Sequence, residues 1–385
     1  MRTVVKNAKI VTDKEVLIGY QCAFNGGYID YIGLKDQDAD VVIDAGNNYL
    51  IPGFIDLHCH GGNGYEFMDA SIDEIKEITS FHLQHGTTTM LATTLVASQA
   101  ETYKALDRLQ TYKDLKTNCV IRGINLEGPW LNPAQCGAQN VLYMREPNAD
   151  ELVELKGKYP SILRVCCAPE LSGGNELGIK GKELGIVMAC AHTDGDFTDM
   201  EKALNSGYTL MTHLYSGMKG VTRKNSFRTA GAVEAGLYFD GYFVEIISDG
   251  RHLPEQLLKF IYKLKGADKI CLITDAIRAC GLPDGTQTVI GSKANGLPVI
   301  VEDGVAKLLD RQSFAGSAST YDVVYRTMAK AIGKDMVALS KMSSLTPAKI
   351  MGWDDVGCIA VGKKADMLIM DENLQIKQII ADKEL

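Results

Sequence analysis

The chain has 385 residues, of which 46% are hydrophobic and 23% charged, values that exclude a disordered, fibrous or collagen-like protein. Its net charge of −8, from 40 basic and 48 acidic residues, gives no overall field that would attract nucleic acid or an anionic membrane. The length suits roughly two domains, or one α/β barrel of about 250 residues with a small appendage.

The first residues contain no long apolar stretch of the kind that forms a signal peptide. No apolar run in the chain approaches the ~20 residues that span a bilayer, so we expect a cytoplasmic protein. The ten cysteines form no CxxC pair, and we expect them to be reduced and mostly in the core.

The first 52 residues have the pattern of short β-strands, for example over 8–11 and 21–24. Asn25-Gly26-Gly27 interrupts this pattern and predicts a β-hairpin. From residue 53 onward, strand-like runs alternate with helical ones, the pattern of βαβ units. The first such unit has a strand over 53–58, a glycine-rich loop, and a helix that begins with a capping box at Ser71 and Glu74.

Eight strand candidates follow one another in this part of the chain. After 53–58 and 87–92, six more end at the residues Leu126, Ala168, Ala191, Thr212, Ser248 and Thr274. This predicts a (β/α)8 barrel of the TIM type over residues 53–352, with functional residues at the C-terminal ends of the strands. Segments 357–361 and 366–370 return to a β pattern, so 1–52 and 353–385 are expected to form one small β-sandwich domain from both chain ends.

His58 and His60 lie two residues apart at the end of the first barrel strand. Alternate side chains of a strand point the same way, so both imidazoles can face the barrel mouth and share one metal ion. A chain with seven histidines can also carry such a pair by coincidence. The position at a strand end favours the metal interpretation.

Three later strand candidates are followed by further metal-binding residue types, namely Glu127, His192 and His213. Taken singly, Glu127 can be a solvated loop residue and each histidine a core residue with satisfied hydrogen bonds. Neighbouring barrel strands that end in such side chains can instead converge on one ion. Three protein ligands leave positions open for water, as catalytic rather than structural metal sites do.

Asp275 follows the eighth strand, where a carboxylate can take a proton from an activated water and pass it to a leaving amine. The same residue can also be a helix N-cap. Asp249 and His252 lie in the loop after the preceding strand. A helix face and a helix C-terminus explain His82 and His85, so we leave both out of the site.

Residues 219–228 contain Lys219, Arg223, Lys224 and Arg228 and no acidic residue. In a chain of net negative charge, this loop is the predicted anion-binding feature. Arg223 would suit a phosphate because its planar guanidinium can bind two oxygens. A solvated basic loop explains the same residues.

Several short motifs extend this pattern over nearly the whole chain. In order they are PGFIDLHCHG (52–61), HGTT (85–88), LEGPWL (126–131), GAQ (137–139), AHTD (191–194), THLY (212–215), DGRH (249–252), TDA (274–276), AGS (315–317), TPA (346–348) and GKKAD (362–366). The set resembles the amidohydrolase superfamily and, within it, the family of N-acetylglucosamine-6-phosphate deacetylases.

The resemblance implies a metal-dependent hydrolase, usually a homodimer, that removes the acetyl group from an N-acetylated amino-sugar 6-phosphate. It implies one or two divalent ions, with zinc as the expected metal, bound by Glu127, His192 and His213 and, for a second ion, by His58 and His60. Asp275 is then the catalytic acid/base, and His252 steadies the developing oxyanion. The implied substrate contacts are Ala138, Gln139, Ser216, Gly217, Arg223, Asp249, His252, Phe314, Ala315 and Gly316.

The chain departs from the family pattern at two places. Ser216-Gly217-Met218 stands where members commonly have Asn-Ala-Met, and Arg223 lacks the Glu-Pro-Gly that follows the phosphate-binding arginine. The alternatives are another amidohydrolase, such as a cyclic amide hydrolase, a deaminase or a deacetylase of a different N-acetyl sugar, and a non-enzymic binding barrel. No lysine replaces Glu127, and every candidate ligand is intact, which favours a deacetylase.

Overall fold

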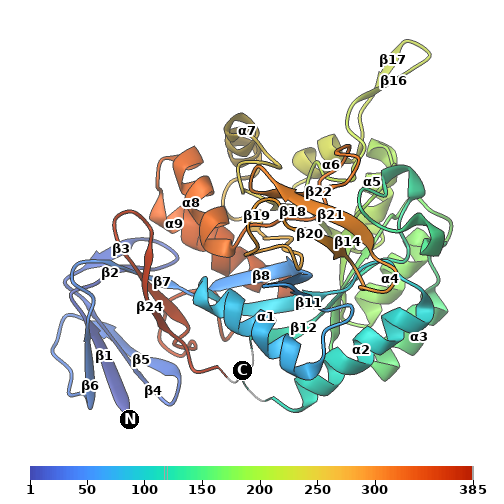
Figure 1. The fold of residues 1–385 in the computed structure, drawn as a ribbon. Helices are drawn as coiled ribbons and strands as arrows, with labels where there is room; N and C mark the ends of the chain where they lie inside the picture. Colours follow the sequence, from blue (N-terminus) through green and yellow to red (C-terminus); the bar gives the residue numbers. More distant parts are fainter. Residues whose placement is uncertain (117, 119, 384–385) are drawn as a thin grey trace.

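The structure is a computed structural model that describes residues 1–383 with the exception of 117 and 119. At its centre lies a parallel sheet of eight strands (Figure 1). The strands neighbour one another in chain order: β8 (Phe54–Cys59), β11 (Thr87–Thr93), β12 (Ile121–Glu127), β13 (Ile162–Cys167), β14 (Val187–Cys190), β15 (Tyr208–Met211), β18 (Phe243–Ile246) and β19 (Ile270–Leu272).

The segment after β19 returns to the first strand of the sheet. Asp275 N–H donates to the carbonyl of His58 at 2.9 Å, and Cys59 forms a parallel bridge with Ala276. These contacts close the ring, which confirms the predicted (β/α)8 barrel. All eight predicted strands therefore lie in one sheet, with their C-terminal ends at the same mouth.

Helices cover the outside of this barrel (Figure 1). They are α1 (Ile72–Gln84), α2 (Gln99–Asp114), α3 (Ala149–Lys158), α4 (Gly174–Glu183), α5 (Phe197–Asn205), α6 (Ala232–Tyr238), α7 (Glu255–Lys265) and α8 (Tyr321–Ile332). The predicted capping box of α1 is present, because Ser71 Oγ accepts from Glu74 N–H and the Glu74 carboxylate accepts from Ser71 N–H. After α8 come α9 (Met336–Ser340), the π-helical turn η3 (Lys341–Leu345) and α10 (Thr346–Met351).

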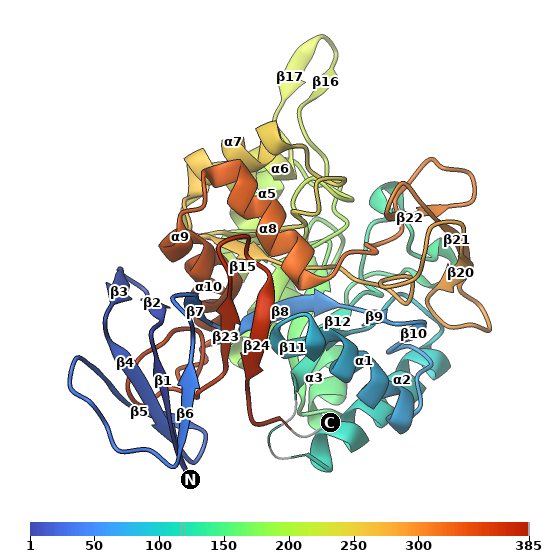
Figure 2. The same ribbon diagram turned by 60° about the vertical axis from the view of Figure 1, so that its left-hand side comes forward.

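Two small sheets lie next to the barrel, one built from N-terminal strands alone and the other from strands of both chain ends (Figure 2). One has the order β5 (Tyr28–Gly33), β4 (Gln21–Asn25), β1 (Arg2–Lys6), β6 (Val41–Asp44), and the other β24 (Ile376–Ile380), β23 (Met367–Met370), β7 (Tyr49–Pro52), β2 (Lys9–Val11), β3 (Val16–Ile18). Asn25 pairs with Tyr28, which confirms the hairpin, and Met367 pairs with Pro52. The division at residues 52 and 353 stays a prediction.

The predicted strand over 357–361 is wrong. Gly357 and Gly362 have φ values of +96° and +88°, which an extended strand does not permit. The segment instead forms bends and a turn, and it joins the edge of β5 by hydrogen bonds. Ile29 N–H donates to Lys363 O, and Gly362 N–H donates to Ile29 O.

Several short strands appear that the sequence analysis did not predict. A three-stranded antiparallel sheet is formed by β20 (Gln287–Ile290), β21 (Leu297–Glu302) and β22 (Val305–Leu308), and a separate hairpin by β16 (Thr222–Lys224) and β17 (Phe227–Thr229). The hairpin stands out from the body of the molecule in both views (Figures 1 and 2). A further pair, β9 (Gly61–Gly62) and β10 (Tyr65–Glu66), follows β8 directly.

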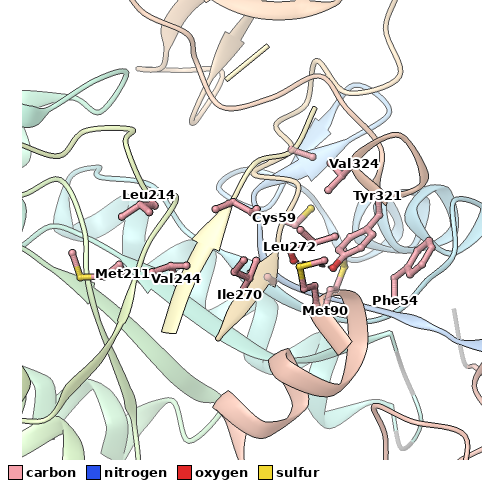
Figure 3. Packing of buried hydrophobic residues seen from close by; sticks show 14 of the residues in the cluster. Phe54, Cys59, Met90, Met211, Leu214, Val244, Ile270, Leu272, Tyr321 and Val324 are labelled. Atoms are coloured by element: carbon pink, nitrogen blue, oxygen red, sulfur yellow. Dashed lines mark hydrogen bonds between the residues drawn. The ribbon is translucent and has the colours of Figure 1, made fainter. Parts of the chain in front are cut away.

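The main core lies between the barrel strands and the surrounding helices (Figure 3). Phe54 of β8 stacks on Tyr321 at the start of α8, with ring centroids 4.8 Å apart. The Tyr321 hydroxyl donates to the carbonyl of Leu272 at 2.8 Å. Among the described residues, no helix combines the length and the apolar character needed to cross a bilayer.

The two buried tyrosines of α8 give a test of this packing. Tyr321→Phe removes a buried hydrogen bond to β19 and should lower the free energy of unfolding by about 1 to 3 kcal/mol. The matched control is Tyr325→Phe, since the buried Tyr325 hydroxyl has no hydrogen-bond partner within the described part of the chain. Denaturant unfolding of both variants measures the difference, and an equal loss in the two would contradict the assignment.

Candidate active site

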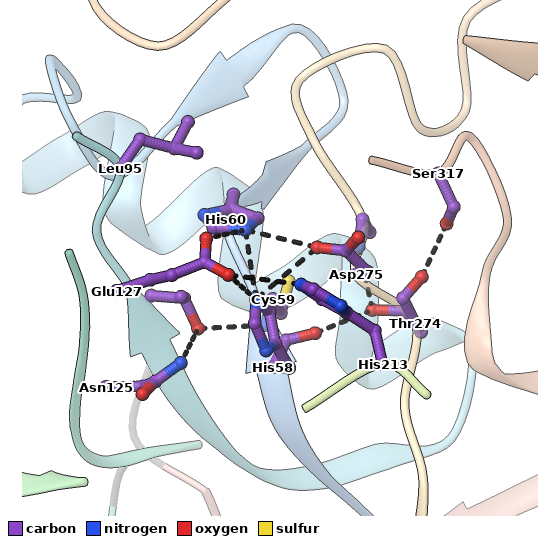
Figure 4. Close-up of polar contacts among 12 residues, drawn as sticks. His58, Cys59, His60, Leu95, Asn125, Glu127, His213, Thr274, Asp275 and Ser317 are labelled. Atoms are coloured by element: carbon purple, nitrogen blue, oxygen red, sulfur yellow. Dashed lines mark hydrogen bonds and ion pairs between the residues drawn. The ribbon is translucent and has the colours of Figure 1, made fainter. Parts of the chain in front are cut away.

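Six side chains of the types that bind metal ions converge at the mouth of the barrel. Figure 4 labels all of them except His192. Each lies at or just beyond the C-terminal end of a barrel strand, where the parallel strands bring their ends together. All six are buried, none being more than 8% exposed. They are His58 in β8, His60 directly after β8, Glu127 at the end of β12, His192 after β14, His213 after β15, and Asp275 after β19.

Three of these residues have a left-handed backbone. The φ values are +44° at His192, +30° at His213 and +51° at Asp275. Non-glycine residues in this region cost roughly 1 to 3 kcal/mol each and gather at functional sites. Each of the three lies two or three residues beyond the last residue of its strand. Asp275 is therefore not the N-cap of a regular helix, and none begins at the residue that follows it.

The donor atoms of the six residues form two overlapping groups. Glu127 Oε1 lies 3.2 Å from His213 Nε2 and 3.5 Å from the Nε2 atoms of His58 and His192. Asp275 Oδ1 lies 3.1 Å from His60 Nε2 and 3.4 Å from His58 Nε2. The donor atoms of His58, Glu127 and His213, and those of His58, His60 and Asp275, each lie within 4.8 Å of one another. His58 belongs to both groups.

Backbone carbonyls fix the tautomers of two of the histidines. His192 Nδ1 lies 2.8 Å from the carbonyl of Gln135, and His213 Nδ1 lies 3.1 Å from the carbonyl of Ser216. A carbonyl can only accept, so both Nδ1 atoms carry the proton and donate. When these two rings are neutral, their Nε2 atoms direct lone pairs at the Glu127 carboxylate. Such an arrangement is repulsive unless a cation lies between the atoms.

A divalent metal ion fits this donor set. Two ligands of a tetrahedral zinc ion, each 2.0 to 2.1 Å from the metal, are about 3.4 Å apart. The observed separations within the two groups start at 3.1 Å and include several near 3.4 Å. Protons alone fit less well, because four imidazolium ions facing two carboxylates would leave a buried net positive charge. The residues present therefore suit one or two divalent ions.

The charges of the centre keep its carboxylates ionised. Burial opposes ionisation of Glu127, but the surrounding imidazoles, His58 first, hold its pKa well below the ordinary value. Burial likewise opposes ionisation of Asp275, but His60 and His58 lower its pKa to about 2. Both groups are thus anionic at neutral pH, as a metal ligand and a general base must be.

The centre opens into a cavity of about 210 Å³. Most of the predicted substrate contacts line it, together with four residues that the sequence analysis did not assign as contacts, Leu95, Gly137, Ile290 and Ser313. The predicted residues in the lining are Ala138, Gln139, Ser216, Gly217, His252, Phe314 and Gly316. Ala315 is fully buried and does not line the cavity.

Two of the predicted contacts hold other site residues in place. Gln139 Nε2 donates to Glu127 Oε2 at 2.6 Å, while its Oε1 accepts from the N–H of Val96. Asp249 Oδ2 accepts from His252 Nδ1 at 2.8 Å, and its Oδ1 accepts from the N–H of His252. Gln139 therefore orients Glu127, and Asp249 orients the ring of His252.

Gly217 explains why the chain departs from the Asn-Ala-Met pattern. Its φ is +58°, and a Cβ at this position would lie 2.7 Å from His192 Nδ1. An alanine would therefore be strained and would crowd the histidine ring. In this chain the loop approaches His192 more closely than an alanine would permit.

Arg223 does not reach the cavity of its own chain. It lies in β16, whose three residues are all exposed, and none of the residues that line the cavity belongs to the β16–β17 hairpin. The hairpin extends away from the rest of the molecule (Figures 1 and 2). Its role in substrate binding stays a prediction.

Comparison with known proteins identifies the family. The model of the amidohydrolase family matches residues 49–384, most of the chain. The chain belongs to the amidohydrolase family. Its N-acetylglucosamine-6-phosphate deacetylase relative in Lysinibacillus sphaericus is 32% identical over 346 residues, covering 88% of this amidohydrolase and 85% of the relative. The N-acetylgalactosamine-6-phosphate deacetylase of Escherichia coli O157:H7 is 28% identical over 387 residues, covering 98% of each chain.

The fold of this amidohydrolase is also similar to that of a solved structure. That structure is a variant of the N-acetyl-D-glucosamine-6-phosphate deacetylase of Mycobacterium smegmatis in complex with N-acetyl-D-glucosamine-6-phosphate. It matches this amidohydrolase with a TM-score of 0.89 at 27% identity, covering 99% of this chain and 97% of that one. The family resemblance inferred from the motifs is confirmed.

Three residues of the cavity lining are not among the predicted contacts and belong to none of the sequence motifs, and the sequence carries a signal for only one of them. Leu95 follows the end of β11, so the strand-end rule that selected the metal ligands could also have selected it. Ile290 and Ser313 come with the β20–β22 sheet, which was not predicted and carries no motif.

The Glu127 carboxylate faces all four imidazoles, so it should dominate metal binding by this amidohydrolase. We expect Glu127→Ala to lose at least about 100-fold in affinity for divalent metal, measured by metal analysis after dialysis against metal buffers. His85→Gln is the control, because His85 pairs with Asp322 outside the centre. Full metal content in Glu127→Ala would remove this residue from the ligand set.

Proposed function

We propose that this amidohydrolase removes the acetyl group from the nitrogen of an N-acetylhexosamine 6-phosphate, giving acetate and the free amino-sugar phosphate. N-acetylglucosamine 6-phosphate is the proposed preferred substrate. The observation that carries the proposal is the convergence of Glu127, His192, His213 and Asp275 at the barrel mouth, in a chain matched over almost its full length by deacetylases of such phosphates.

A second substrate is supported by a specific observation. The N-acetylgalactosamine-6-phosphate deacetylase relative covers 98% of the chain at 28% identity, against 88% at 32% for the N-acetylglucosamine-6-phosphate deacetylase relative. The two sugars differ only in the configuration of one ring hydroxyl. Acetate release from both phosphates therefore belongs in the first activity assay.

The proposed mechanism divides the proton transfers among residues of this chain. A divalent ion held by the donor set supplies a Lewis acid for the water and for the acetamide carbonyl. Asp275 accepts the proton of the attacking water and delivers it to the departing nitrogen. His252, with its ring fixed by Asp249, stabilises the oxygen on which negative charge develops.

We propose zinc as the metal, in one or two copies. Imidazole nitrogen and carboxylate oxygen are the donors that catalytic zinc sites use, with three protein ligands and an open position. Glu127, His192 and His213 would hold the first ion, and His58 and His60, with Asp275, a second. The cytoplasmic location expected from the sequence stays a prediction.

We further propose that the enzyme is a homodimer in which Arg223 binds the phosphate of a substrate in the partner subunit. The cavity lining contains no lysine or arginine among the described residues, so it offers no side-chain cation to a phosphate. The exposed hairpin also carries Val221 and Phe227, which are 58% and 78% exposed. Apolar surface of this kind is what a second subunit would cover.

Asp275→Asn tests the proposed acid/base. The variant should fold and bind metal but lose about 10²- to 10⁴-fold in kcat for acetate release, because an amide cannot accept the proton. Asp303→Asn is a matched control, since Asp303 is an exposed aspartate with the same left-handed backbone, φ +58° against +51°. Unchanged turnover in Asp275→Asn would exclude this residue from the proton transfers.

Arg223→Ala tests the phosphate assignment. It should raise KM for the sugar phosphate at least about tenfold and leave the reaction of the unphosphorylated N-acetylhexosamine unchanged, since the guanidinium binds only the phosphate. Arg228→Ala on the same hairpin is the control. Mixing Arg223→Ala subunits with Asp275→Asn subunits should restore activity if the arginine acts across the dimer. An unchanged KM in Arg223→Ala would place the phosphate elsewhere, and a lack of restoration would exclude binding across the dimer.

A further inference from the structure

Two opposite charges are buried inside the barrel below the metal-binding side chains. Arg164 lies in the middle of β13 and Glu245 in β18, and both side chains have 0% exposure. The neighbouring residues of both strands are apolar or cysteine. Removing two charges from water is costly, so a pair in this position calls for a specific role. The proposed proton transfers use neither residue.

Arg164 connects four strands of the barrel. Its Nη2 donates a charge-assisted hydrogen bond to Glu245 Oε2 at 2.8 Å, and its Nη1 lies 2.6 Å from Glu245 Oε1 as a close ion pair. Nη1 also donates to the carbonyl of Leu57 at 2.8 Å, and Nη2 to Thr212 Oγ1 at 3.0 Å. Leu57 directly precedes His58, and Thr212 directly precedes His213.

Glu245 faces the rear of one metal-binding ring. Its Oε2 lies 3.6 Å from His58 Nδ1, slightly beyond hydrogen-bond distance. That Nδ1 is buried and has no hydrogen-bond partner in the described part of the chain. The Nε2 atom on the other side of the same ring faces Glu127 and Asp275. A buried ring nitrogen normally has a hydrogen-bond partner, and Glu245 is the carboxylate positioned to accept a hydrogen bond from His58 Nδ1.

We propose that Arg164 and Glu245 are a positioning pair for the metal ligand His58. Glu245 accepts the Nδ1 proton of His58, so the Nε2 lone pair points at the metal. Arg164 holds the carboxylate in place and anchors the backbone before His58 and His213. Carboxylates that hold a metal-binding histidine in this way set its tautomer and orientation. Because His58 belongs to both donor groups, the pair influences both ion positions.

This inference rests on the proposed metal-dependent function, but its test reads metal binding directly. A purely structural ion pair is the competing explanation, and a double substitution separates the two. Replacing a buried pair by apolar residues can preserve stability, whereas removing one partner leaves an unpaired charge. We therefore expect Arg164→Met and Glu245→Leu alone to lower the melting temperature of the metal-free protein, and the double variant to regain most of it.

The deciding measurement is the zinc affinity of the double variant, obtained by titrating metal-free protein with Zn²⁺ against a chromophoric chelator. We expect it to bind zinc 10- to 100-fold more weakly than the wild type, despite the regained stability. The control is the double variant Lys383→Met with Asp366→Leu, which replaces another ion pair whose side chains are 3% and 9% exposed and lie away from the barrel mouth. Its zinc affinity should be unchanged. Wild-type affinity in the Arg164→Met, Glu245→Leu protein would overturn the proposal.

A second measurement needs no variant, in case the double substitution does not fold. Nitrogen-15 NMR of the histidines in the zinc-loaded wild type should show His58 protonated at Nδ1 and bound to metal through Nε2. The opposite assignment would overturn the proposal. If the wild type binds zinc but releases no acetate from any N-acetylhexosamine phosphate, the proposed function is wrong. The zinc titration and the NMR measurement still test the role of Arg164 and Glu245 in that case.

Discussion

The structure depends on one electrostatic constraint, the burial of two carboxylates among four imidazoles at a common point. Glu127 and Asp275 are held within 3.1 to 3.5 Å of ring nitrogens whose lone pairs, at His192 and His213, point toward carboxylate oxygen. Without a cation these atoms repel, so the fold has to supply the energy that keeps them together. The barrel supplies it through strand pairing and through the large buried core around its strands.

The constraint also explains where the backbone is strained and where polar groups are buried. The left-handed backbone at His192, His213 and Asp275 takes these side chains out of the regular alternation of a strand. Gln139 and Asp249 then hold Glu127 and His252 by hydrogen bonds. The left-handed backbone and the buried polar groups cost stability, and the hydrogen bonds offset part of that cost. Together they produce a centre whose side chains are in place before a substrate arrives.

Segments outside the barrel decide what can enter this centre. The β20–β22 sheet and the loop that follows it bring Ile290, Ser313 and Phe314 to the cavity wall. The β16–β17 hairpin carries the basic residues away from the cavity of its own chain. The chemistry therefore belongs to the strand ends, while the shape of the cavity and any phosphate binding belong to insertions between them.

Much of the fold was predictable because local sequence encodes it. Eight apolar runs, the Ser71–Glu74 capping box and the turn at Gly26 each depend on neighbouring residues, and all are present as expected. The strand prediction over 357–361 was wrong because an apolar composition does not reveal that Gly357 and Gly362 have left-handed backbone angles. The β20–β22 sheet was missed because its strands are short and belong to no repeating pattern.

The sequence by itself determined the residue types available for chemistry and their placement at strand ends, because strand periodicity and closure of the barrel are read from local patterns. Only the tertiary structure decided which partners those residues meet. Gln139 contacts Glu127 across a loop, Arg164 and Glu245 meet inside the barrel from strands 81 residues apart, and Arg223 lies away from the cavity. Such pairings depend on how the strands are staggered and how the loops pack, and no local pattern contains that information.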